Sequence, residues 1–129
     1  MPLATVDEAH ASLQVISREI AAELNEARVA LETFAERPDD RDALHRFAAH
    51  VHLARGALRL AEVYGGALLA EEMEFVARYV DAHSGEGRAD ADGLDALMRA
   101  MEQLPSYVER VATGAREATA HVAAHASQS

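Results

Sequence analysis

The sequence predicts an all-α fold, an up-down-up-down antiparallel four-helix bundle. Alanine and leucine dominate with scattered charges, a composition typical of helices. No segment shows the alternation of apolar and polar residues that marks a strand. Four segments each carry one apolar face, and the connections between them are short. At 129 residues, the chain is expected to form a single domain over residues 1–129.

The first helix is predicted to run from about residue 5 to residue 36. Thr5 and Glu8 have the spacing of a capping box at its start. Pro38 ends it, because the residue before a proline avoids helical angles. Its apolar stripe recurs at spacings of three, four and seven and consists of Leu13, Ile16, Ile20, Leu24, Leu31 and Phe34.

The second and third helices are predicted to form a hairpin. Asp39 or Asp40 caps the second helix, and Tyr64-Gly65-Gly66 is predicted to end it, since glycine accepts the left-handed C-terminal position. The third helix is predicted to begin near Ala67 and to end before Ser84. The second helix buries Leu44, Phe47, Val51, Leu58 and the alanines Ala54 and Ala61. The third buries Leu69, Met73, Val76 and Val80.

The fourth helix is predicted to be long and to be kinked or broken. Asp90 or Asp92 caps it, and Pro105 falls inside its apolar stripe, where a proline removes a hydrogen bond. That stripe consists of Leu94, Leu97, Met98, Met101, Leu104, Val108 and Val111. After Gly114 the composition thins to alanine, histidine, threonine and serine, so residues 115–129 are expected to form a frayed tail.

Composition and charge exclude several classes of protein. The net charge is −10 and all 12 cations are arginine, so nucleic acid is not an expected partner. The chain has no cysteine, which excludes disulfides and thiolate metal sites. Its N-terminus does not read as a signal peptide, and no apolar run approaches the ~18 residues of a membrane span. A cytoplasmic protein without membrane contact is expected.

The residues that favour a chemical function are His52, Arg55 and Gly56 on the second helix. His52 follows the core residue Val51, so its imidazole lies at the edge of the buried stripe. A glycine inside a helix costs about 1 kcal/mol relative to alanine, and Gly56 therefore indicates close approach of another group. The guanidinium groups of Arg55 and Arg59 are suited to holding phosphate oxygens.

The hairpin register adds an acid to this group. With the turn centred on Val63, His52 lies opposite Glu74 and Arg55 lies opposite Glu71. A carboxylate that accepts the proton of one imidazole nitrogen leaves the other nitrogen free as a nucleophile. The alternative interpretation is structural: a boundary histidine, a glycine that permits close helix packing, and glutamates on a solvated face.

The other histidines carry weaker signals. His45 lies one heptad before His52 and is placed on the same face, whereas His50 points elsewhere. His121 and His125 are four apart, a spacing that suits a metal pair. Because no glutamate follows His121 in the metallohydrolase pattern and the tail is expected to be weakly structured, no metal site is expected.

Two aromatic residues of the third helix leave another question open. Phe75 and Tyr79 are four apart beside the acidic face, so they lie on one side of the helix. They form either an exposed docking patch or a contact with a neighbouring helix.

The segment resembles the histidine phosphotransfer (HPt) family, whose signature is His, two residues, Lys or Arg, then Gly. His52, Arg55 and Gly56 fill the signature, and Glu74 occupies the place of the glutamate found in chemotaxis-kinase phosphotransfer domains. The resemblance implies phosphorylation of Nε2 of His52, a ring oriented by Glu74, a phosphate contact from Arg55 and access beside Gly56.

The same resemblance implies the partners. They would be receiver domains of response regulators and the catalytic domain of a histidine kinase, docking near Arg59, His45 and Glu71. The domain would carry the phosphoryl group without turnover of its own. It would need no cofactor, because Mg²⁺ belongs to the partner receiver or kinase.

A narrower likeness covers about residues 20 to 114. The segments 56–60, 64–74 and 104–109 are similar to the N-terminal domain of the hybrid kinase of type IV pilus twitching motility (ChpA/PilL), shared with the FimL scaffold. Two positions depart from typical phosphotransfer domains: Glu62 replaces a second glycine, and Ala54 replaces a larger aliphatic residue. FimL-type members generally lack the phosphorylatable histidine. The sequence is therefore compatible with two functions: a phosphorelay carrier, and a scaffold that binds receivers or pilus-pole proteins.

Overall fold

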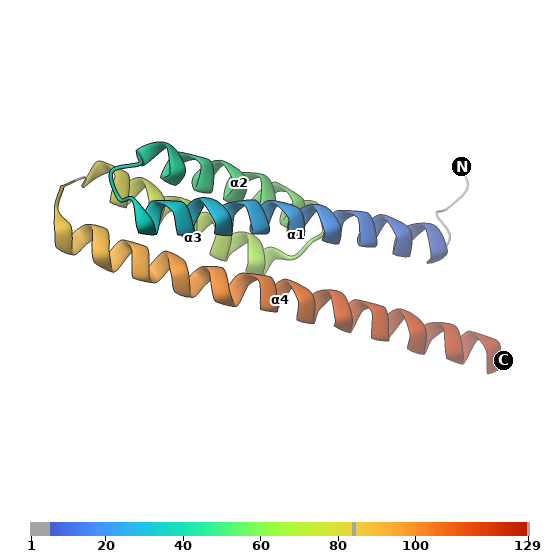
Figure 1. The fold of residues 1–129 in the computed structure, drawn as a ribbon. Coiled ribbons are helices and arrows are strands. Elements are labelled where there is room, and N and C mark those ends of the chain that lie inside the picture. The colour runs from blue at the N-terminus through green and yellow to red at the C-terminus, as the bar shows by residue number, and fades with distance from the viewer. Residues whose placement is uncertain (1–5, 84, 129) are drawn as a thin grey trace.

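A computed structural model of the chain describes residues 6–83 and 85–128 as four helices joined by short connections (Figure 1). The helices are α1 (Val6–Glu36), α2 (Arg41–Leu60), α3 (Tyr64–Ala82) and α4 (Gly87–Gln128). Each helix packs against the next, and α1 also contacts α4, which closes the bundle. The described residues contain no strand. The predicted antiparallel four-helix bundle is therefore confirmed.

The core is built from the stripes that the periodicity predicts. The largest fully buried side chains are Phe34, Phe47, Ile20, Leu44, Leu58, Met73, Leu97, Leu104, Val51 and Val80. Met98 and Val111 were predicted in the core but are exposed. Met98 lies about 100° around α4 from the buried Leu97, which places it beyond the edge of the buried face. The side chain of Leu13 and the predicted capping box at Thr5 lie outside the described residues.

The start of α2 follows the prediction, but its end does not. The Asp40 carboxylate accepts a hydrogen bond from the backbone N–H of Ala43 at 3.2 Å. At the other end, α2 stops at Leu60, and Glu62 takes the left-handed conformation with φ of 61°. The N–H of Val63 bonds to the carbonyl of Leu58, and the N–H of Glu62 bonds to that of Arg59. These two bonds form a Schellman motif.

Gly65 and Gly66 are consequently not the stop signal that the sequence suggested, because both lie in the first turn of α3. A Cβ on Gly66 would lie 3.2 Å from Leu58, and one on Gly65 would lie 2.6 Å from the hydroxyl of Tyr107. The two glycines therefore let α3 approach α2 and α4 closely.

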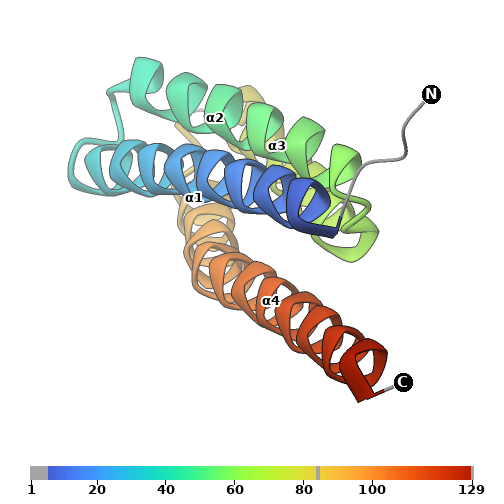
Figure 2. The same cartoon turned by 90° about the vertical axis from the view of Figure 1, so that its right-hand side faces the viewer.

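Three expectations for α4 are wrong. The helix begins at Gly87, so Asp90 lies in its first turn and neither Asp90 nor Asp92 caps it. It continues through Pro105, so of the two predicted alternatives, a kink or a break, the break is wrong. It also continues to Gln128 where a frayed tail was expected, and the final part extends past the connection between α2 and α3 (Figures 1 and 2). Alanine, the best helix former, dominates that segment and explains its conformation.

Candidate functional site

The candidate site is formed by a histidine of α2 and a glutamate of α3. Nδ1 of His52 lies 2.9 Å from Oε1 of Glu74. The His52 side chain is 61% exposed, whereas that of Glu74 is only 10% exposed. An ionised carboxylate can only accept, so Nδ1 carries the proton and Nε2 keeps its lone pair. Among the described residues nothing hydrogen-bonds to Nε2. The site thus presents a tethered imidazole with its second nitrogen open to solvent.

Arg55 provides the cation of the site. Its Nε lies 3.2 Å from Oε2 of Glu74, and its Nη2 lies 3.2 Å from Nδ1 of His52. Arginine only donates, so the contact with Nδ1 competes with the contact from Glu74. The carboxylate decides this competition, because the other tautomer would point a nitrogen lone pair at a negative oxygen. Arg55 therefore acts mainly as the counter-charge of a nearly buried carboxylate.

Gly56 leaves open space one helical turn beyond His52. It is exposed, and a Cβ placed on it would meet nothing within 4 Å. The interpretation that this glycine permits close helix packing is therefore wrong. The bare backbone lies beside the exposed imidazole, on the face where another molecule can approach.

The remaining candidate residues do not join the group. Arg59 and Glu71 are exposed, and neither forms an ion pair among the described residues. The predicted pairing of Arg55 with Glu71 is wrong, since Arg55 contacts Glu74 instead. Glu71 lies almost a full turn before Glu74, and its rotation around α3 directs it outward. Nε2 of His45 lies 3.0 Å from Oδ2 of Asp81.

A second histidine–glutamate pair joins α2 to α1. Nδ1 of His50 lies 2.7 Å from Oε2 of Glu23, so this ring engages the same nitrogen as His52 does. The His50 side chain is 29% exposed, about half the value for His52. The sequence places His50 away from His52 but does not reveal this partner. The register of the α1–α2 hairpin gives the height of Glu23 relative to His50 but not the rotation that brings the two side chains together.

The outer face of α3 carries exposed apolar and aromatic side chains beside the exposed glutamates Glu71 and Glu72. Phe75 and Tyr79 are both exposed, so the alternative that they pack against a neighbouring helix is wrong. Tyr64 and Leu68 are also exposed and lie on the same side of α3 by helical spacing. These four side chains form one stripe, referred to below as the α3 stripe.

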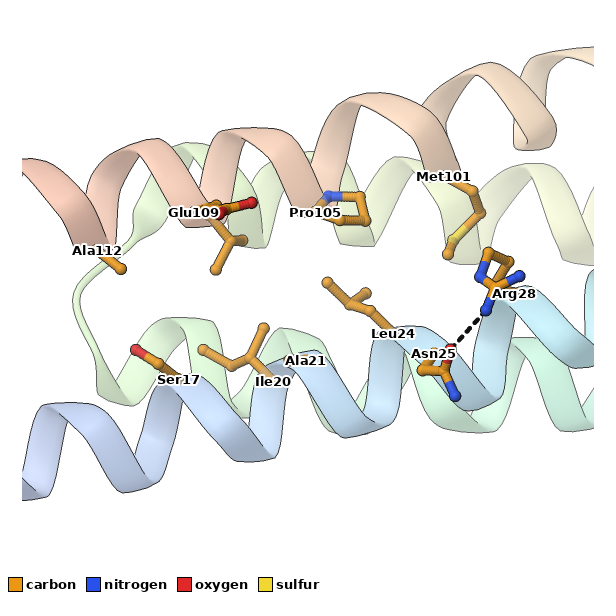
Figure 3. A pocket seen from close by; sticks show the side chains of 11 residues that line it. Ser17, Ile20, Ala21, Leu24, Asn25, Arg28, Met101, Pro105, Glu109 and Ala112 are labelled. Atoms are coloured by element: carbon orange, nitrogen blue, oxygen red, sulfur yellow. Dashed lines mark hydrogen bonds between the residues drawn. The ribbon is translucent and has the colours of Figure 1, made fainter.

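A separate groove of about 420 Å³ lies between α1 and α4 (Figure 3). Ile20, Leu24 and Met101 point into it, and Arg28 lies at one end with Nη2 2.6 Å from Oδ1 of Asn25. None of the candidate site residues lines this groove. It is therefore a separate feature from the His52 site.

Fold and site together define a small all-α bundle domain that presents to solvent a histidine whose Nδ1 is held by a nearly buried glutamate. The chain belongs to the FimL C-terminal domain family, whose family model matches residues 7–129. It is thus a member of a pilus- and chemotaxis-related scaffold family. No curated protein and no solved structure matches the chain. Among the residues that the structure describes, no helix has the length and apolar character needed to cross a membrane.

Proposed function

We propose that this domain is a phosphoryl carrier of the HPt type, in which Nε2 of His52 accepts and passes on a phosphoryl group. The contact of 2.9 Å between His52 and Glu74 carries the proposal. That contact leaves Nε2 as the nucleophile, and the 61% exposure of the ring gives a partner access to it.

The transfer is a displacement at phosphorus. The Nε2 lone pair forms a P–N bond while the P–O bond to the donor breaks, leaving a receiver aspartate or, with a kinase, ADP. The proton stays on Nδ1, so the phosphorylated ring is cationic. Glu74 accepts from that N–H, and its negative charge offsets the charge of the ring. Any Mg²⁺ would be held by the partner, as expected for a domain without a cofactor of its own.

Arg55 and Gly56 support the same chemistry. Arg55 holds its guanidinium beside the ring, where it can attract phosphate oxygens. Gly56 leaves the approach free of side-chain atoms. Membership of the FimL family supports a place in chemotaxis-type signalling that governs type IV pili and twitching motility. The donor and acceptor would be receiver domains or a histidine kinase in the cytoplasm, docking near Arg59, His45 and Glu71.

Phosphotransfer from a loaded partner tests the proposal. The purified domain is incubated with a phosphorylated receiver or a kinase and labelled ATP, and acid-labile label on the domain is measured. We expect label on the wild type and none on His52→Gln. His50→Gln is the matched control, since His50 also engages Nδ1 but is less exposed, and it should label like the wild type. An unlabelled wild type, or equal labelling of His52→Gln, would overturn the proposal.

A second candidate function is a scaffold that binds partners without phosphotransfer. It is favoured by the family match and by the exposed α3 stripe, which offers apolar surface without using the histidine. Glu62, where phosphotransfer domains typically have glycine, also motivates it. Binding of a receiver or pilus-pole protein that is unchanged in His52→Ala, with no phosphorylation, would support the scaffold. Binding that requires the imidazole would count against it.

A further inference from the structure

The helical end of α4 gives His121 and His125 a fixed position relative to each other. A weakly structured tail would leave His121 and His125 with no fixed relationship, and this was one reason to expect no metal there. In the structure both lie in a continuous helix that ends at Gln128. A spacing of four then places them one turn apart on the same face. Both side chains are exposed.

The two rings converge on each other. Their Nε2 atoms are 2.9 Å apart, and the ring planes are inclined at 81°. Two neutral imidazoles at this distance must share one proton, with one nitrogen donating and the other accepting. The other histidines with contacts in the described residues use carboxylates or a backbone carbonyl: His45 with Asp81, His50 with Glu23, His52 with Glu74, and His83 with the carbonyl of Tyr79.

We infer that His121 and His125 form a two-histidine binding site for a divalent transition metal of the Ni²⁺ or Cu²⁺ class. Imidazole nitrogens bind such metals at about 2.0–2.1 Å. Two ligands at right angles around the metal are then about 2.9 Å apart, whereas tetrahedral ligands would be about 3.3 Å apart. The distance between the two Nε2 atoms matches the right-angled arrangement, which square-planar and octahedral ions adopt.

The surroundings limit what the site can do. Among the described residues no group of three His, Cys, Asp or Glu side chains gathers as a metal site, so water would complete the coordination. The residues between the histidines are Val122, Ala123 and Ala124, which offer no further ligand. The two imidazoles are therefore the protein ligands of the proposed site. The net charge of −10 favours accumulation of cations around the domain.

Calorimetric titration of the full, untagged chain with nickel sulfate tests the inference. Wild type, His121→Ala, His125→Ala and the double variant are compared, and His83→Ala serves as the control. We expect each single variant to bind Ni²⁺ at least tenfold more weakly than the wild type. Each should bind as weakly as the double variant, because one imidazole cannot chelate the ion. His83→Ala should bind like the wild type, and acidification should release the metal by protonating the ligands.

Two results would overturn the site. One is wild-type affinity in either single variant, which would show that one histidine suffices or that the metal binds elsewhere. The other is an absence of nickel binding to the wild type. The three variants of His121 and His125 should keep the helix content of the wild type in circular dichroism, because both rings are exposed. The outcome is independent of phosphorylation at His52, which uses a different helix.

Discussion

The guanidinium of Arg55 lies against the carboxylate that tethers the His52 ring, with Nε of Arg55 3.2 Å from Oε2 of Glu74. The Oε2 atom is buried and accepts no hydrogen bond among the described residues, so this ion pair is its compensation. Glu74 thus has a cation on one oxygen and an imidazole N–H on the other. The charge balance of the site depends on Arg55 even before any phosphate arrives.

Removing that cation should destabilise the fold. Arg55→Gln would leave a nearly buried carboxylate without its counter-charge, and we expect a loss of roughly 1–2 kcal/mol in the free energy of unfolding. Urea denaturation followed by circular dichroism measures it. The control is Arg59→Gln on the same helix, where the arginine is exposed and forms no ion pair within the described part of the chain. Equal stability of the two variants would show that Arg55 does not compensate Glu74.

The carboxylate that orients the ring should matter for the rate of phosphorylation. Glu74→Gln keeps the shape and an acceptor for Nδ1–H but removes the negative charge that offsets the cationic phosphorylated ring. We expect the initial rate of labelling to fall about tenfold, which corresponds to about 1.4 kcal/mol. Glu72→Gln, at an exposed glutamate of the same helix outside the proposed docking residues, should label at the wild-type rate. A similar loss of labelling rate in both variants would mean that the overall negative charge of α3 matters rather than the specific contact with His52.

The effect of Gly56 on phosphotransfer can be separated from its effect on the stability of the fold. A Cβ at Gly56 meets nothing within 4 Å, so Gly56→Ala should stabilise the helix by up to about 1 kcal/mol. If the open backbone serves an approaching partner, the same variant should nevertheless slow phosphotransfer. Gly114→Ala is the control, because it also meets nothing within 4 Å but lies far along the chain on α4. It should gain stability and label normally. Unchanged transfer in Gly56→Ala would remove this glycine from the site.

Local sequence signals predicted the features that depend on local interactions. The Asp40 cap and the apolar stripes follow from hydrogen bonding and helical periodicity within one element, and the structure reproduces them. The hairpin register placed His52 and Glu74 at the same height, and they are in contact. Register does not give rotation, however, so it could not decide whether Arg55 meets Glu71 or Glu74.

Features that depend on tertiary contacts were not predictable in the same way. Gly65 and Gly66 read as a helix stop, but their role depends on contacts with Tyr107 of α4 and with Leu58 across the α2–α3 connection. The pairing of His50 with Glu23 joins two helices whose relative rotation the sequence does not give. The composition after Gly114 predicts a frayed tail, but α4 continues to Gln128 because alanine is the best helix former.

The left-handed residue at the end of α2 provides a last prediction. Glu62 has φ of 61°, a conformation that costs an L-residue about 1–2 kcal/mol. It is held there by the Schellman bonds from Val63 to Leu58 and from Glu62 to Arg59. Glycine has no such penalty, although its greater freedom in the unfolded chain offsets part of the gain. Glu62→Gly should therefore raise the free energy of unfolding by about 0.5–1 kcal/mol.

The neighbouring Ala61 gives the matched control for this substitution. Ala61 has φ of −80° and ψ of 0°, an ordinary right-handed conformation, so Ala61→Gly should lower stability through the entropy of the unfolded chain and the loss of a half-buried methyl group. Urea denaturation of both variants, with an unchanged m-value, separates the two effects. Opposite signs are expected because the backbone conformations are opposite. A loss of stability in Glu62→Gly would mean that the glutamate side chain contributes more to this connection than the strained backbone costs.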